Sequence, residues 1–257
     1  MGTIIAAMGE EVVSRRRNLI VGWTLAALAM ALFANLGLWQ SRRAVEKQAM
    51  LDAAAQVLSS RTPHPLALAA DPARARAYDW ALGSGEFEDK GALLLDNQQR
   101  NGRAGVRAYR IFRPEQGTAL LVDLGWLPLA GDRRLPHVPR PQGRVELRGL
   151  LVPPPSTGLV MGPAMGRDGG AWLMTRVDTA AIVRETGLSA PIAPRVLRLD
   201  PKLPIGYERD LELLPNTLPP EQHRGYALQW FALALAVLVT ALVLTFRKPR
   251  RGQGVPP

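Results

Sequence analysis

The chain has 257 residues, a formal net charge of +10 and no cysteine. Without thiols it can form neither disulfide bonds nor a thiolate metal site. Its basic clusters lie beside apolar runs, and its middle lacks a basic helix with interleaved aromatic residues. We therefore expect a lipid bilayer, and no nucleic acid, as its partner.

Two long apolar runs lie near the ends of the chain, at Leu19–Leu38 and Gly225–Phe246. Each supplies the roughly 20 residues that a helix needs to cross a bilayer. Helical periodicity continues beyond the first run through Ser41–Leu58, where residues 35, 39, 42 and 46 would share one face. The predicted segments are a leader over 1–18, a transmembrane helix over 19–40, a soluble domain over 41–222, a second transmembrane helix over 223–246 and a basic tail over 247–257.

Positively charged residues predict the orientation of these segments. Four of the first five residues after the second run are Lys or Arg, which favours a cytoplasmic C-terminus. Because two spans put both termini on one side, we expect both termini in the cytoplasm, the central domain in the periplasm and the protein in the bacterial inner (plasma) membrane. We interpret Arg15–Arg17 as a basic flank, with a twin-arginine export signal as the alternative.

The middle of the chain predicts an α+β fold, with a mostly antiparallel β sheet or partial barrel and short helices. Its short aliphatic or alternating segments are separated by Gly, Pro, Asp and Asn, as antiparallel strands are. Asp178–Glu185 predicts an amphipathic helix ending at Gly187. Asp71 before Pro72 is typical of a helix start, so we expect a short helix over 71–78. The expected strands are Trp80–Glu88, Ala92–Gln98, Val106–Arg113, Ala119–Trp126, Arg144–Leu151, Trp172–Val177 and Arg195–Leu199.

Two further stretches are expected to lack helices and strands. We interpret the glycines at 162, 166, 169 and 170 as part of a mobile loop, and a phosphate-binding loop is the less favoured alternative. Pro201–Pro220 carries five prolines and cannot form a long helix or a central strand. We expect an extended strap that returns the chain to the membrane.

The sequence contains no H-E-x-x-H, P-loop or G-x-S-x-G motif, so we expect no enzymatic activity and no catalytic residue. Of its three histidines, His64 and His137 lie beside prolines and are expected at the surface. His223 instead lies at the start of the second apolar run, aligned with Tyr226 and Trp230. It is a functional candidate there, because neutral imidazole is a common ligand of haem iron. The alternative is a histidine that only hydrates the helix end.

Other polar side chains lie at the same membrane boundary. Three arginines suit the propionates of haem because guanidinium pairs with carboxylate, and lipid headgroups are their alternative partners. These arginines are Arg42, Arg43 and Arg224. Gln229 lies one turn inside the membrane, where its amide needs a partner, and we expect Asn35 or Gln40 to supply it.

The two ends carry motifs that occur together in one known family. The motif residues are Leu36, Trp39, Gln40, Arg42, Arg43 and Lys47 at one end, His223, Tyr226, Ala227, Gln229, Trp230 and Phe231 at the other, and Gly85–Phe87, Leu95–Asn97, Gly105 and Val122–Pro128 between them. Over about 39–231 the chain resembles the surfeit locus protein 1 family. It departs from that pattern at Leu124, where many members have arginine. Arg100, Arg103 and Arg107 are candidates to replace that arginine, and the sequence does not choose among them.

This resemblance implies an assembly factor, or chaperone, for the haem–copper cytochrome c oxidase of the respiratory chain. Its implied partners are oxidase subunit I and haem a synthase, and its implied cofactor is haem a, bound transiently with His223 on the iron. We hypothesise that Trp39, Tyr226 and Trp230 wall the porphyrin, with Gln40 and Gln229 beside it. The alternative is a membrane-anchored interaction scaffold that stabilises oxidase assembly intermediates without binding a cofactor.

Overall fold

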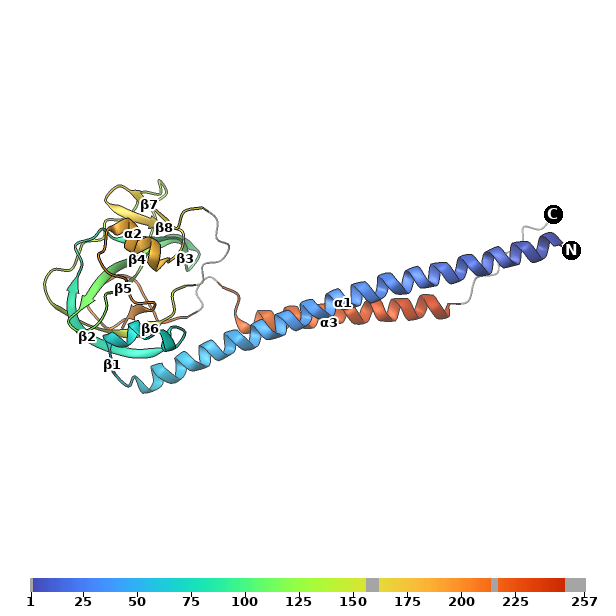
Figure 1. Ribbon diagram of the computed structural model, residues 1–257, viewed down its shortest axis with the longest axis horizontal. Coiled ribbons are helices and arrows are strands. Elements are labelled where there is room, and N and C mark those ends of the chain that lie inside the picture. The colour runs from blue at the N-terminus through green and yellow to red at the C-terminus, as the bar shows by residue number, and fades with distance from the viewer. Residues whose placement is uncertain (1, 156–161, 214–216, 248–257) are drawn as a thin grey trace. The chain divides into compact units, whose positions relative to one another are not determined.

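The computed structural model describes residues 2–155, 162–213 and 217–247 and divides into two compact units. The first, here called the helical unit, contains residues 1–49 and 218–257. The second, the β unit, contains residues 50–217. Figure 1 labels α1 and α3, and in the β unit it labels α2 and the strands β1 to β8. Together these elements make the α+β fold that the sequence predicts.

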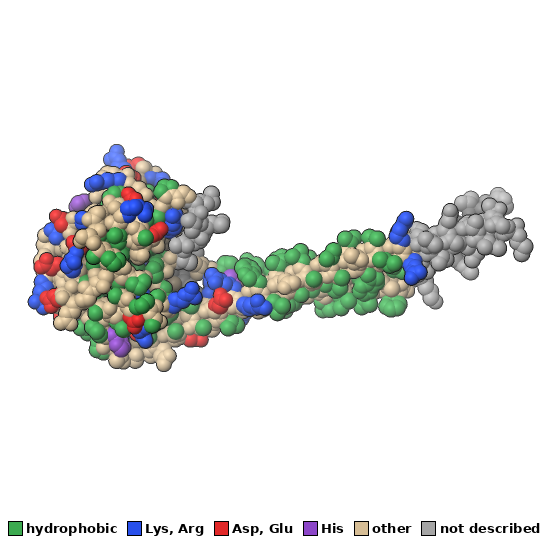
Figure 2. Space-filling view, in the orientation of Figure 1, with side chains coloured by type: hydrophobic (Ala, Val, Ile, Leu, Met, Phe, Trp, Pro, Cys, Tyr) green, Lys and Arg blue, Asp and Glu red, His purple; other side chains and the backbone are tan. Residues whose placement is uncertain are grey.

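The helical unit pairs most of α1 (Gly2–Ser60) with α3 (Pro220–Phe246). Both helices are long and apolar enough to cross a membrane. Many of their large apolar side chains are exposed, among them Leu28 at 64% and Leu228 at 71%, and Figure 2 shows such side chains along the helices. Exposure of this much apolar surface is unfavourable in water. The helix surfaces therefore suit a lipid environment.

Local sequence explains where these helices begin and end. α3 begins at Pro220, and proline suits the first helical position because its φ is already helical and it has no N–H to leave unpaired. α1 continues past the apolar run to Ser60, which confirms the helix expected through Leu58. It ends at Ser60 because Arg61 adopts φ +45° and leaves the helical conformation. Pro63 then disfavours helical backbone in Thr62.

The β unit is a nine-stranded sheet with the order β1-β2-β6-β9-β5-β4-β3-β8-β7. A further pairing of β2 with β4 closes β2, β6, β9, β5 and β4 into a ring, so part of the sheet forms a barrel. Six strand pairs are antiparallel and three are parallel. The strands are β1 (His64–Pro65), β2 (Asp79–Phe87), β3 (Leu93–Arg100), β4 (Arg103–Pro114), β5 (Leu120–Pro128), β6 (Val145–Val152), β7 (Met165–Asp168), β8 (Ala171–Met174) and β9 (Val196–Leu199).

All seven predicted strands are present, with ends that differ by a few residues. The two that were missed are β1 and β7, of two and four residues. β7 corrects the interpretation of the glycine-rich stretch as a loop: Gly166 lies within the strand, and Gly169 and Gly170 form its tight turn into β8. Gly169 has φ +59°, as a two-residue hairpin turn requires.

The two short helices predicted within the β unit have different outcomes. α2 (Thr179–Thr186) is present, with Asp178 accepting a hydrogen bond from Ala181 N–H at its start and Gly187 in the left-handed conformation at its end. The helix expected over 71–78 is reduced to a 3₁₀ turn, η2 (Pro72–Arg74), which Asp71 caps. The N-terminal signal was recognised correctly, but no apolar face follows it to extend the helix.

Most strands of the β unit are buried on both faces. Consecutive residues of β3 enter different clusters, Leu93 in the first and Leu94 in the second. The first cluster also contains Ile182 of α2 and Ala54 of α1. The second contains Leu66 of the 3₁₀ helix η1 (Leu66–Ala70). Because both faces are covered, the strands have nearly continuous aliphatic sequences instead of a strict polar–apolar alternation.

The first part of the predicted strap is held along β5. The β4–β5 register shifts at Leu124, which is the extra residue of a bulge,. Its free carbonyl accepts from Tyr207 N–H at 2.7 Å, and Trp126 N–H donates to the Glu208 carbonyl at 2.8 Å. Gly125 has φ +115°, and a Cβ there would lie 2.8 Å from the Glu208 oxygen. A glycine is therefore required where the strap crosses the strand.

The side chain of Leu124 is buried within the second apolar cluster. This position therefore contributes packing in the present chain and makes no ion pair. The three arginines considered as replacements have carboxylate partners of their own. Arg100 pairs with Glu208 and Asp210. Arg103 pairs with Glu208 and lies over the ring of Trp126, and Arg107 pairs with Asp123.

A buried carboxylate neutralises the most deeply buried cation of the β unit. Arg195 is fully buried, and its Nη1 lies 2.5 Å from Asp79 Oδ2. Arg74 Nη2 lies 2.5 Å from the other oxygen. Burial by itself would raise the pKa of Asp79, but the hydrogen bonds and positive charges of Arg74 and Arg195 outweigh it and hold that pKa below its usual value. Asp79 is therefore ionised in the folded protein.

We expect Asp79→Asn to lower the free energy of unfolding by about 3–5 kcal/mol, because Arg195 would remain buried without a carboxylate. The measurement is urea unfolding of the full chain in detergent micelles, followed by tryptophan fluorescence. Glu185→Gln is the matched control, since Glu185 pairs with Arg184 at the surface and should change stability by less than about 1 kcal/mol. Equal losses in the two variants would contradict the assignment.

The same carboxylates predict loss of stability in acid. Burial opposes ionisation of Asp79, Asp200 and Asp210, yet hydrogen bonds and arginine charges hold the pKa of each below its usual value. A lowered folded-state pKa adds stability that is complete above the unfolded value of about 4 and is lost as pH falls through the folded value. Melting temperatures should therefore stay level between about pH 5 and 7 and fall steeply below about pH 4, with a smaller fall for Asp79→Asn.

Candidate functional site

The antiparallel contact between α1 and α3 forms the candidate site of the helical unit. The contact face of α1 repeats at intervals of three and four residues, as one face of a helix does. A Cβ on Gly37 would lie only 2.7 Å from the ring of Phe231, so this glycine lets the two helices approach closely. Gly37, Ala44 and Lys47 of α1 are buried on this face, and so are His223 and Ala227 of α3.

The contact face differs from the face that the sequence singled out. Asn35, Trp39, Arg42 and Glu46 share one side of α1 as expected, but all four are exposed. The buried positions are offset from them by one or two residues along the helix. Periodicity identified which residues share a side, but it did not identify the side that meets α3, because both sides mix apolar and polar residues.

His223 lies in this contact with one ring nitrogen bound and the other free. Its Nδ1 is 2.6 Å from Oε1 of Gln40. An amide oxygen can only accept, so Nδ1 carries the proton and Nε2 of the neutral ring keeps its lone pair. Only 6% of His223 is exposed, and Nε2 is a buried atom without a hydrogen-bond partner among the described residues.

Two further contacts hold the first turn of α3 against α1. Lys47 is 7% exposed and donates from Nζ to the carbonyl of Leu218 at 2.5 Å. Arg224 Nη2 donates to Oε1 of Gln48 at 3.2 Å. Leu218 lies just before α3 and Arg224 directly follows His223, so the chain is held to α1 on both sides of His223 in the sequence.

The other predicted site residues lie around the contact without meeting His223. Trp39 and Tyr226 are 56% and 42% exposed. Trp230 stacks on Phe33 with ring centroids 5.7 Å apart. Arg42 is exposed, and Arg43 forms an exposed ion pair with Glu46 at 3.1 Å.

The partner predicted for Gln229 is wrong. Asn35 donates to the carbonyl of Ala31 within its own helix, and Gln40 accepts from His223. Gln229 itself is exposed, so it faces away from α1. The expectation placed a glutamine of α3 opposite Gln40, whereas the antiparallel register places His223 there.

Gly37 and Lys47 are the site residues that sequence reasoning left without a role. Gly37 lies in an apolar helix, where glycine lowers stability unless close packing requires it. That cost was the sequence signal that could have identified Gly37 as a contact residue. Lys47 was noted only as a residue of the motif. Its burial depends on the Leu218 carbonyl, and no pattern along the chain indicates that contact.

The donor set determines which metal chemistry this site can support. Within the described part of the chain, no three His, Cys, Asp or Glu side chains gather as a metal site. His223 therefore offers a single ligand, with its tautomer set by Gln40 as in metal-bound histidines. That fits a metal whose other ligands come with it. Because Nε2 is itself covered, such a group reaches it only when neighbouring side chains move.

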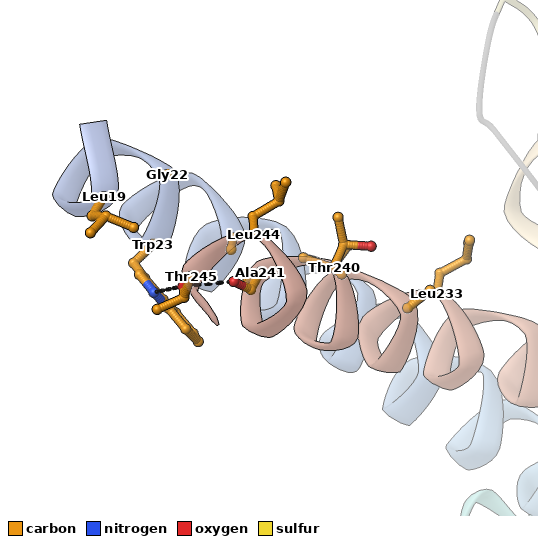
Figure 3. A pocket seen from close by; sticks show the side chains of 11 residues that line it. Leu19, Gly22, Trp23, Leu233, Thr240, Ala241, Leu244 and Thr245 are labelled. Carbon is orange, nitrogen blue, oxygen red and sulfur yellow. Dashed lines mark hydrogen bonds between the residues drawn. The ribbon is translucent and has the colours of Figure 1, made fainter. Parts of the chain in front are cut away.

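An apolar groove of about 380 Å³ also lies between the two helices, at the end where Trp23 donates to Thr245 at 3.0 Å (Figure 3). Its lining on α3 begins at Leu233. That residue follows His223 by ten positions, or roughly 15 Å along a helix. The groove is therefore separate from the imidazole contact.

We expect Gly37→Val to separate α1 from α3 near His223, because its side chain would overlap the Phe231 ring. The chain has no natural cysteine, so Gln40→Cys with His223→Cys gives one possible cross-link, scored by mobility on a gel. Cross-linking should fall several-fold in Gly37→Val. Gly22→Val is the matched control, since a Cβ there meets nothing within 4 Å. Unchanged cross-linking in Gly37→Val would contradict the close packing.

The chain is similar to a known protein family. The model of the SURF1 family matches residues 27–235, which include most of α1, the whole β unit and the first half of α3. A search of curated proteins finds no match.

Proposed function

The chain belongs to the SURF1 family, and from that premise we propose that it assists cytochrome c oxidase assembly by holding haem a at His223. The family is linked to the assembly of that oxidase. Haem a is the cargo in this proposal, and His223 contributes one ligand to its iron. Delivery would be to subunit I, with haem a synthase as the source.

The observation that carries the proposal is the state of the His223 ring. Its Nδ1 is bound to Gln40, and its Nε2 is buried with no partner among the residues described. A buried nitrogen without a partner costs free energy, and an iron bound there would remove that cost. Gln40 keeps the proton on Nδ1, so the lone pair of Nε2 stays available.

The charged and aromatic side chains near His223 suit the propionates and the porphyrin ring of haem a. Arg42 and Arg224 are exposed, and Arg224 uses one nitrogen on Gln48. Their guanidinium groups can pair with the propionates of haem. Arg43 would do the same after leaving its exposed pair with Glu46, which is weak,. Trp39 and Tyr226 would face the porphyrin ring.

The two apolar helices support a place in the bacterial inner membrane. We propose that α1 and α3 cross it with both termini in the cytoplasm and the β unit in the periplasm, following the positive residues after Phe246. Haem a is hydrophobic, so a protein within the bilayer can receive and release it without exposing it to water. The chain would then act as a carrier and not as an enzyme.

We expect His223→Ala to remove bound haem a from protein purified from cells that make this haem. The measurement is the visible spectrum and the haem content per chain. His64→Ala is the matched control and should keep the haem content of the wild type. If His223→Ala kept the same content, the ligand role would be excluded. If the wild type carried no haem but co-purified with oxidase subunits, the scaffold alternative would replace this proposal.

The variant Gln40→Leu tests whether Gln40 positions the His223 ring while His223 itself remains the ligand. Loss of a hydrogen-bond partner behind a metal-bound histidine typically weakens metal binding by about 10–100-fold. Haem should therefore still bind to Gln40→Leu, but with weaker affinity and a shifted Soret band. Wild-type affinity and spectrum in this variant would show that Gln40 does not orient the ring.

A further inference from the structure

A polar cavity of about 550 Å³ is lined only by residues of the β unit, and none of them belongs to the proposed haem site. Three segments line it: Gly91 and Ala92 before β3, the connection over 132–138, and the turn between β7 and β8. Arg110 of β4 also lines it. Cavities of a few hundred Å³ have the size at which proteins bind small molecules.

Arg110 is unlike the other buried arginines. Arg107 and Arg198 share Asp123, and Arg195 pairs with Asp79. Arg110 is only 6% exposed, yet no carboxylate among the described residues lies within the 4 Å of an ion pair with it.

The partners of Arg110 are neutral. Its Nη1 donates to the carbonyl of Lys90 at 2.9 Å and its Nη2 to that of Val138 at 2.5 Å. Nε has no partner in the part of the chain that the structure describes. Burial lowers the pKa of this guanidinium, since a buried cation without a counter-ion is unfavourable. The charge of Asp89 partly offsets this effect, but no carboxylate of the described residues forms an ion pair with Arg110.

The rim of the cavity adds positive charge and exposed backbone. Arg133, Arg134 and His137 lie on the 132–138 connection. With Arg110, the lining holds three arginines against two carboxylates, Asp132 and Asp168. Arg134 is 88% exposed and pairs with Asp132 at 3.0 Å, and Arg133 pairs with Asp96 at 3.3 Å. These surface pairs are weak, so an entering anion can compete for either arginine.

The turn that also lines the cavity consists of glycines. Gly169 and Gly170 join β7 to β8, and a Cβ at either position would meet nothing within 4 Å. Their backbone is therefore open to a ligand, which is the property for which glycine is used where backbone approaches an anion. The phosphate-loop alternative considered for these glycines thus has a physical basis, although they lie in a hairpin turn and not before a helix.

We propose that this cavity binds a small soluble organic anion, with its carboxylate or phosphate group toward Arg110 and its edge against Arg134, His137 and the Gly169–Gly170 turn. Guanidinium binds both kinds of group through charge-assisted hydrogen bonds. The ligand supplies the negative charge that Arg110 lacks. The site rests on the β unit alone, so it stands or fails independently of haem binding at His223.

The test uses the full chain in detergent micelles, titrated with inorganic phosphate in one arm and succinate in the other. Sodium chloride at matched ionic strength is the reference, and binding is measured by calorimetry and by the shift in melting temperature. At least one of the two anions should raise the melting temperature above the chloride reference and give saturable binding. Absence of saturable binding for both anions up to 50 mM would overturn the proposal.

The variants locate the binding. Arg110→Lys should weaken it by about tenfold or more, because lysine cannot replace the charge-assisted hydrogen bonds of the planar guanidinium. Arg134→Ala and His137→Ala are exposed changes that should leave the fold intact and weaken binding by about threefold each. Arg184→Ala is the matched control, since Arg184 is a similarly exposed arginine paired with Glu185.

Two results from these variants would overturn the proposal. The first is an equal loss of binding in Arg184→Ala and Arg134→Ala, which would mean a general effect of net charge. The second is wild-type affinity in both Arg134→Ala and His137→Ala. If Arg110→Lys failed to fold, as judged by circular dichroism, the two rim variants would still decide the matter.

Discussion

The proposed haem site depends on one interaction, the hydrogen bond between Gln40 and His223. It joins the two apolar helices, and it also sets the protonation of the imidazole. A histidine on an isolated helix would exchange tautomers and turn freely. Here the hydrogen bond of Nδ1 holds the ring in one orientation, and Nε2 has no hydrogen-bond partner among the described residues. The same hydrogen bond therefore pairs the two helices and leaves the Nε2 lone pair available to a ligand.

The helical unit reaches this arrangement by close packing. Gly37 removes a side chain that would meet Phe231, and Lys47 anchors the residue before the prolines that start α3. Lipid tails do not drive helices together as water does, so helix pairs in membranes depend on small residues and on polar contacts. The contact between α1 and α3 has both. Its polar contacts gather near His223, whereas Trp23 and Thr245 supply one at the other end.

The β unit is organised by buried ion pairs, whereas the helical unit depends on small residues and polar contacts. Three of its buried arginines are balanced by aspartates. Arg107 and Asp123 join the neighbouring strands β4 and β5, whereas the pairs of Arg195 with Asp79 and of Arg198 with Asp123 join segments far apart in sequence. Such pairs specify which strands meet more than they add stability. Arg110 lies beside a cavity and is not balanced by an aspartate in this way, and such exceptions occur most often where a protein binds a ligand.

The strap is held along β5 by backbone hydrogen bonds at the bulge of Leu124.

The sequence by itself determined the elements whose signals are local. Apolar length predicted the two long helices, turn residues and aliphatic runs predicted seven strands, and Asp178 with Gly187 predicted α2. The end motifs also identified the family and singled out His223. The tertiary structure alone revealed which face of α1 meets α3, that Gln40 binds His223, and that no carboxylate of the described residues forms an ion pair with Arg110. These features depend on residues brought together from distant parts of the chain, and periodicity along one segment carries no information about what lies opposite it.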